Sequence, residues 1–150
     1  MKFLVLFLLT AILLYAEKVT VTADHFEAYE NKKISILTGH VHIQKGTDDI
    51  NADRLVIELN SKNRPIRYIL TGHVQFDIHT QREHYTGTAQ KIMYDSAQKR
   101  YIAEGNVFLR EKNSDKTLHG EKIVIDRTSG KTIITGKRDK PVKFTFTVEE

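Results

Sequence analysis

Cysteine is absent from this chain of 150 residues. No disulfide can therefore staple the fold, and no thiol can act as a catalytic nucleophile. Stability must come from the hydrogen bonds of the backbone and from buried apolar area.

Motifs of catalysis and of metal binding are also missing. The chain has no Gly-x-Ser-x-Gly, no His-Glu-x-x-His and no phosphate-binding loop. Asp24 and Asp53 recur at matching positions of a repeat, which indicates hydrogen bonding at a turn or an edge. His40 and His42 share one strand face, with His73 as the repeat equivalent of His40, but no third ligand has a suitable spacing. We predict no enzyme, no metal site and no cofactor.

Long apolar runs are limited to the start of the chain. Phe3–Leu14 is apolar apart from Thr10. A membrane-spanning helix needs about 20 such residues, so this shorter run predicts a signal peptide over residues 1–16, cleaved after its last residue, Ala16. The mature protein is then one domain, residues 17–150, exported to the periplasm. An uncleaved membrane anchor is the alternative.

An excess of charge of one sign is absent as well. Lysine and arginine number 23 against 19 aspartates and glutamates, a net charge of +4. Such a mildly basic surface tolerates an anionic ligand but does not require nucleic acid, and export argues against that partner.

Helical periodicity is lacking, and alternation of polar and apolar residues takes its place. Lys18–Thr22, Arg54–Leu59 and Val142–Val148 all alternate with a period of two. This period indicates strands with two different faces. Turn signals recur between the runs, at Glu30-Asn31, Ser61-Lys62-Asn63, Asn113-Ser114-Asp115 and Ser129-Gly130. The sequence therefore predicts an all-β protein.

Two short elements recur along the chain. Thr38–Val41 returns as Thr71–Val74, with changes as Glu104–Val107, and in part as Thr135-Gly136; the glycines are 33, 33 and 31 residues apart, and an isoleucine stands three residues before each. A second element precedes each glycine by 16, 20, 16 and 16 residues and reads Ala23–Phe26, Ala52–Leu55, Ala89–Ile92 and Gly120–Ile123.

A fixed period of this kind predicts stacked supersecondary units. The glycine allows a positive φ or a bulge, so the chain can bend sharply between one strand and the next. We predict an elongated, open β-jelly roll with two sheets, built from four repeated units of antiparallel strands.

These elements resemble the LptA/OstA-like family of periplasmic lipopolysaccharide transport proteins. The resemblance covers Val19–Thr147 and rests on Ile50–Ile57, Thr38–Val41, Glu104–Leu109 and Gly120–Ile123 in this order and spacing. It implies an open cleft that takes the lipid A acyl chains, while sugars and phosphates stay outside.

The resemblance also implies partners. Copies of the fold meet edge to edge in a head-to-tail homo-oligomer, and they bridge an LptC-like inner-membrane component and an LptD-like outer-membrane translocon. The strand expected over Val142–Val148 can pair with the first strand, Val19–Thr22, of a neighbouring copy. Candidates for contact with lipid A phosphates are the basic residues Lys32, Lys33, Lys99, Arg100, Lys137, Arg138, Lys140 and Lys143.

The wall of the cleft needs apolar side chains on the inward positions of each repeat, and the same residues could alternatively form a closed core. The predicted lipid-binding residues are Val19, Val21, Ile36, Val41, Ile43, Leu55, Ile57, Ile69, Val74, Phe76, Ile92, Tyr94, Ile102, Val107, Phe108, Leu109, Ile123 and Ile125.

Two other functions stay open from the sequence. One is a membrane-anchored, LptC-like jelly-roll component of the same machinery, which requires an uncleaved first segment. The other is a self-assembling structural β-repeat protein without a lipid ligand, which requires a closed and dry core.

Overall fold

The structure, a computed structural model, describes residues 18–79 and 84–149; the predicted signal peptide, residues 1–16, lies outside these ranges. The described residues form strands and turns without a helix, so the all-β prediction is confirmed. No helix within these ranges is long and apolar enough to cross a membrane. The strands are β1 Val19–Thr22, β2 His25–Tyr29, β3 Ile34–Lys45, β4 Asp48–Leu59, β5 Pro65–His79, β6 His84–Asp95, β7 Arg100–Glu111, β8 Lys116–Asp126, β9 Thr132–Thr135 and β10 Lys143–Thr145.

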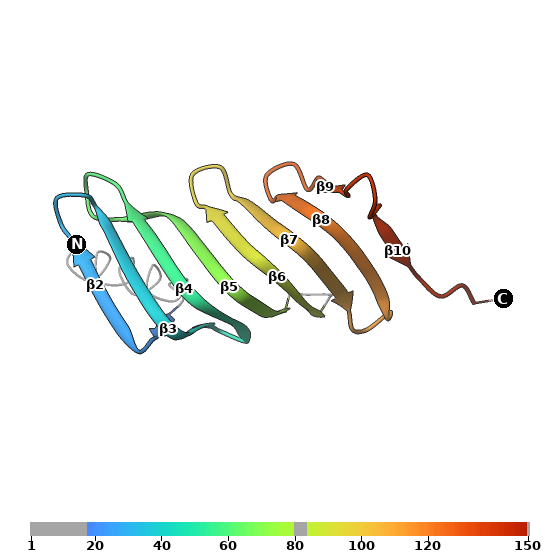
Figure 1. Cartoon of the computed structure of the whole chain (residues 1–150), viewed down its shortest axis with the longest axis horizontal. Helices are drawn as coiled ribbons and strands as arrows, with labels where there is room; N and C mark the ends of the chain where they lie inside the picture. The colour runs from blue at the N-terminus through green and yellow to red at the C-terminus, as the bar shows by residue number, and fades with distance from the viewer. Residues whose placement is uncertain (1–17, 80–83, 150) are drawn as a thin grey trace, which may run out of the picture.

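All ten strands belong to one antiparallel sheet. The strands β3 to β8 follow one another along the long axis of the molecule, with the first strands at one end and β10 at the other (Figure 1). Two short strands share each end: β1 and β2 pair with opposite halves of β3, and β10 and β9 pair with opposite halves of β8.

Each repeat glycine lies inside a long strand and bends it. At Gly72, φ is +82°, and the next residue, His73, has φ +47°. The register between β5 and β6 shifts between Thr71 and Val74, across these two residues. The same register shift occurs in β3 and in β7. A left-handed pair of residues is one way to insert a β-bulge, and a bulge bends its strand. The predicted bend is confirmed, although the strand continues through it.

The line of bulges divides the sheet into two arms, so the two predicted sheets are two halves of one hydrogen-bonded sheet. The first arm consists of β2, β9 and residues 34–38, 54–59, 65–71, 91–95, 100–104 and 122–126. The second arm consists of β1, β10 and residues 41–45, 48–52, 74–79, 84–89, 107–111 and 116–120.

The core lies along this bend, in two rows of side chains that run across the sheet. The first-arm row is Leu37, Leu55, Leu70, Ile92, Ala103 and Ile123. The second-arm row is Val41, Ala52, Val74, Ala89, Val107 and Gly120. Every buried hydrophobic side chain of the described residues belongs to one of these rows. In the second row each valine faces an alanine or a glycine, so large and small side chains alternate and fill the bend evenly.

The turns are closed by side chains that accept backbone hydrogen bonds. Asp95 accepts from the N–H groups of Ala97 and Gln98, at 3.0 and 3.1 Å. Asn60 does the same for Lys62 and Arg64, at 2.9 and 3.0 Å. Such Asx turns explain why polar clusters mark the ends of the alternating runs. The turns predicted from these clusters are confirmed.

Candidate functional site

The face of the sheet that carries the core rows is called the concave face, because the sheet bends towards it. Beyond the core, each arm adds one more row on this face. In the first arm the register partners are Ser35, Ile57, Tyr68, Tyr94, Tyr101 and Ile125. In the second arm they are Val21, Ile43, Ile50, Phe76, Gly87, Leu109, Leu118 and Phe144. The concave face is thus almost continuously apolar from β1 to β10.

Exposure on the concave face increases from the bend towards the rims. Leu55 and Val41, at the bend, are 0% and 1% exposed. One row further out, Ile57, Tyr68 and Phe76 are only half-buried. If the two arms closed on each other, these side chains would be as buried as the core. The space between the arms is therefore open to solvent along its length.

Three tyrosines form an aromatic strip on the first arm of this face. The ring centroids of Tyr68 and Tyr94 are 6.2 Å apart, and those of Tyr94 and Tyr101 are 4.4 Å apart. Burial raises the pKa of Tyr68 and of Tyr101 above the usual value for a phenol. Both therefore stay neutral at physiological pH and contribute apolar ring area to the face.

Most of the predicted wall residues lie together on the concave face. They are Val19, Val21, Val41, Ile43, Leu55, Ile57, Val74, Phe76, Ile92, Tyr94, Val107, Leu109, Ile123 and Ile125. Some of them, such as Val74 at 0% exposure, are core and have no surface to offer a ligand. Their lipid-binding role stays a prediction.

Four of the predicted wall residues point the other way, and the expectation that they face inward is corrected. Ile36 and Ile69 each precede a core leucine, and neighbouring residues of a strand face opposite sides. Ile102 precedes Ala103 of the core row, and Phe108 follows the buried Val107. The three isoleucines belong to an apolar stripe on the convex face, made of Ile36, Val56, Ile69, Met93, Ile102, Val124 and Ile133.

Sequence reasoning also missed members of the concave face. Leu37 and Leu70 sit between the repeat isoleucine and Thr-Gly, and Tyr68 and Tyr101 stand one position before that isoleucine. The identity of these residues carries no signal, because apolar residues stand on both sides of the isoleucine. The alanine that begins the second element offered a better signal, since Ala52 and Ala89 are small residues that each lie opposite a valine of the first element.

The two repeated sequence elements meet at the convex side of the bend. The Nδ1 atom of His73 lies 2.8 Å from Asp53 Oδ2, and in the first repeat His40 and Asp24 are 2.7 Å apart. In the fourth repeat Lys137 takes the place of the histidine and pairs with Glu121 at 3.5 Å. These polar pairs hold the residue after the glycine, which explains the acidic residues recognised in the repeat. The basic residue Lys137 is thus engaged in closing the last repeat.

The pKa of His73 is raised by its hydrogen bond to Asp53, and the pKa of His40 is raised by its hydrogen bond to Asp24. The stabilisation of the fold by each histidine–aspartate pair is fully present below the unfolded pKa of histidine, about 6.5, and is lost as the pH rises through the higher folded pKa. We expect an NMR titration to give His73 a pKa above 6.5, and we expect Asp53→Asn to lower this pKa. Asp24→Asn is the control and should lower the pKa of His40 alone. A His73 titration that Asp53→Asn leaves unchanged contradicts the pairing.

Exposed apolar side chains gather at the two ends of the sheet. Val19 is 51% and Phe26 is 60% exposed on β1 and β2. At the other end Phe144 and Phe146 are exposed, with ring centroids 5.2 Å apart. The first and last strands also have one unpaired edge each. Both ends therefore present backbone groups together with apolar side chains.

Two shallow hollows open away from the core rows. One lies beside the turn between β2 and β3 and is lined by Tyr29 and Leu59, among others. The other lies at Gly87, between Phe76 and Phe108. Neither is lined by a core residue.

Comparisons with known proteins agree with this architecture. The sequence model of a family described as LptA/(LptD N-terminal domain) LPS transport protein matches residues 20–131. No curated protein matches the chain. The fold is similar to the crystal structure of LptH, described as the LptA homologous periplasmic component of the conserved lipopolysaccharide transport device from Pseudomonas aeruginosa, with a TM-score of 0.74. The two are 13% identical, over 88% of this chain and 96% of that chain. The open jelly-roll fold is confirmed.

Proposed function

The chain belongs to the LptA/LptD N-terminal domain family of lipopolysaccharide transport proteins, and from this premise we propose that it binds lipopolysaccharide and carries it through the periplasm. The lipid A acyl chains lie on the concave face between the two arms, and the sugars and phosphates stay in solvent beyond the rims. The protein acts by binding and transfer, without a catalytic step.

The half-exposed apolar rows of the concave face carry this proposal. In a closed core, apolar side chains such as Ile57 and Phe76 would be fully buried, whereas here they remain in contact with solvent. Each methylene of an acyl chain that leaves water for such a surface contributes about 0.8 kcal/mol. A lipid with several chains is therefore held by area alone, and can slide along the face without breaking specific polar contacts.

The ends of the sheet provide the route from one protein to the next. We propose that β10 of one copy pairs with β1 of another, which joins unlike edges of the same arm and continues the concave face from copy to copy. The exposed Val19, Phe26, Phe144 and Phe146 are then buried in the junction. The same edges suit an LptC-like component at the inner membrane and an LptD-like translocon at the outer membrane, since both would present the same kind of fold.

A pair of neighbouring residues tests the lipid site. Ile57 and Val56 are consecutive, apolar and half-buried, but Ile57 faces the concave side and Val56 the convex side. A photo-crosslinking residue at position 57 should give an adduct with lipopolysaccharide, because the acyl chains lie within reach. The same residue at position 56 is the matched control and should give little or none. Adducts are measured by gel mobility and immunodetection, with phosphatidylcholine as the comparison lipid.

Equal labelling at both positions, or no labelling of protein with a β-sheet circular dichroism spectrum, contradicts the lipid site. Absence of any adduct favours the self-assembling protein without a ligand. The LptC-like alternative is decided separately, because the mass of the purified protein shows whether the first 16 residues are retained.

A further inference from the structure

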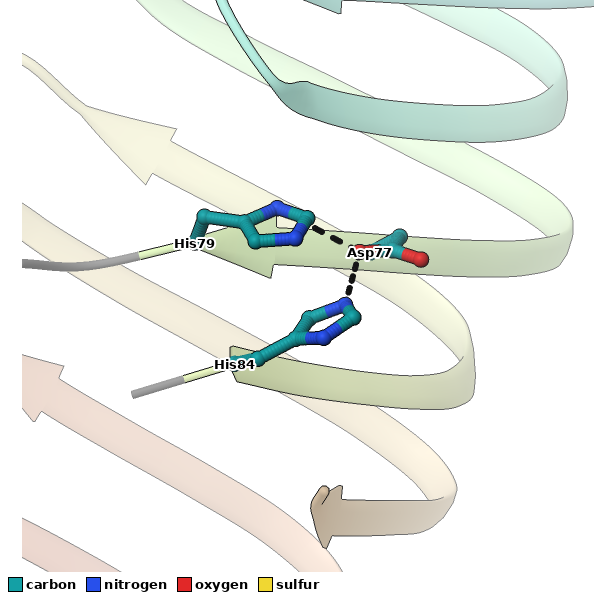
Figure 2. Close-up of side chains that lie close together, drawn as sticks. All are labelled: Asp77, His79 and His84. Carbon is teal, nitrogen blue, oxygen red and sulfur yellow. Dashed lines mark hydrogen bonds and ion pairs between the residues drawn. The ribbon is translucent and has the colours of Figure 1, made fainter. Parts of the chain in front are cut away.

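A cluster of two histidines and one aspartate lies on the convex face of the second arm, far from the bend. Asp77 and His79 are two positions apart on β5, so their side chains share a face. His84 on β6 is the register partner of His79. Figure 2 shows both imidazole rings directed to the carboxylate of Asp77. The cluster lies on the opposite face from Phe76, and so takes no part in the proposed lipid site.

The three side chains of the cluster already lie close to one another. His84 Nε2 is 2.5 Å and His79 Nδ1 is 3.5 Å from the same oxygen, Asp77 Oδ1. The two imidazole rings stack with centroids 3.8 Å apart and planes 20° apart. One candidate ligand atom from each residue lies within 4.8 Å of the other two. Two hydrogen-bonded strands fix all three backbone positions.

We propose that Asp77, His79 and His84 bind a divalent transition-metal ion of the zinc type. Imidazole nitrogen and carboxylate oxygen are zinc ligands, with bonds of about 2.0–2.2 Å in a tetrahedral arrangement. Ligand atoms around such an ion are roughly 3.4 Å apart, so small side-chain rotations convert the observed cluster into a coordination shell. The ion replaces the hydrogen bond between His84 and Asp77. Three protein ligands leave a fourth position for water or another oxygen ligand.

Other histidine–aspartate pairs in the protein lack the third ligand. His42 contacts Asp49 on the same face of the same arm, and His73 contacts Asp53 at the bend. Within residues 18–79 and 84–149, the Asp77 cluster alone brings three such groups together. The His42–Asp49 pair therefore provides a matched comparison for the site.

The experiment uses the full chain without a polyhistidine tag, freed of metal with EDTA and titrated calorimetrically with zinc chloride. We expect one ion per chain. Loss of even an outer-shell partner weakens a metal site by about 10–100-fold, so His79→Ala, His84→Ala and Asp77→Ala should each weaken binding at least ten-fold. His42→Ala is the control and should bind as the unmodified chain does. Zinc at about one hundred times its Kd should also raise the melting temperature by roughly 5–10 °C.

Two results of the calorimetric titration overturn the proposal. One is the absence of saturable binding, and the other is binding that His84→Ala and His42→Ala change equally, which indicates adventitious binding to surface histidines. Cobalt gives a second measurement on the unmodified chain, which needs no variant to fold. A ligand-field absorption band of tetrahedral cobalt that zinc displaces supports the site, and only the spectrum of hydrated cobalt contradicts it.

Discussion

Replacing Leu55 with alanine should lower the free energy of unfolding by about 2–5 kcal/mol, because a large side chain is lost from the centre of the bend. Leu55 is 0% exposed, and its register partners on the two neighbouring strands are Leu37 and Leu70. The cavity cannot be refilled from these strands, since the hydrogen-bonded sheet fixes their spacing. Urea unfolding measures the loss, and the melting temperature should fall by roughly 10 °C.

The neighbouring Val56 gives the matched control. Val56 lies on the convex face and remains half-exposed, so Val56→Ala should cost about 1 kcal/mol or less. Equal losses for Val56→Ala and Leu55→Ala would mean that the bend is not the main core of the protein.

Replacing Gly72 with alanine should destabilise the protein by about 2–5 kcal/mol, for two separate reasons. The residue has φ +82°, a left-handed conformation that costs a residue with a Cβ about 1–2 kcal/mol. A Cβ atom would also stand 2.7 Å from the Cβ of Asp53 and against its carboxylate, and overpacking adds about 1–3 kcal/mol. Urea unfolding again measures the change.

Gly130 separates the two contributions. Its φ is +74°, but no atom of the described residues lies within 4 Å of the position of its Cβ. Gly130→Ala should therefore cost the backbone contribution alone. Adding Asp53→Ala to Gly72→Ala should recover part of the larger loss by removing the overlap. If Gly72→Ala costs no more than Gly130→Ala, close packing of Asp53 against the glycine plays no part in the bend.

The fold was predictable because its signals are local. Alternation over runs such as Arg54–Leu59 marked the strands, and the recurring glycines marked the bends. The polar residue of the second element was recognised as a hydrogen-bonding position, and the structure pairs Asp53 with His73 across the bend. That the two predicted sheets are one was not predictable, because continuity through a bulge depends on hydrogen bonds and not on residue type.

The faces of the site residues were harder to predict, since the bend interrupts the alternation. On β4 both Asp53 and Arg54 point outward between the buried Ala52 and Leu55. A simple count by twos across this corner gives the wrong face on one side of it. Ile36 and Ile69 were misplaced although the alternation holds across the glycine on β3 and β5, where Leu37 and Val41, and Leu70 and Val74, are the buried residues.

The Asp77 cluster shows a different limit of sequence reasoning. His79 and His84 are five positions apart, which is neither a strand nor a helix spacing for a shared face. Only the register of the β5–β6 pair places the two rings against each other. The sequence analysis weighed His40 and His42, which share one strand, and predicted no metal site, so the neighbouring strands of His79 and His84 were not considered together.

The order of the strands has a consequence for how the chain reaches this structure. Within the described residues each strand contacts only its hydrogen-bonded neighbours, and most neighbours are joined by short turns. Loop closure then costs little entropy at every step, and the contact order is low for an all-β protein. Any central hairpin can serve as a nucleus, and neighbouring hairpins can then add to its edges one after another. The terminal strands join last and open first, so the edges available to a partner belong to the least protected part of the protein.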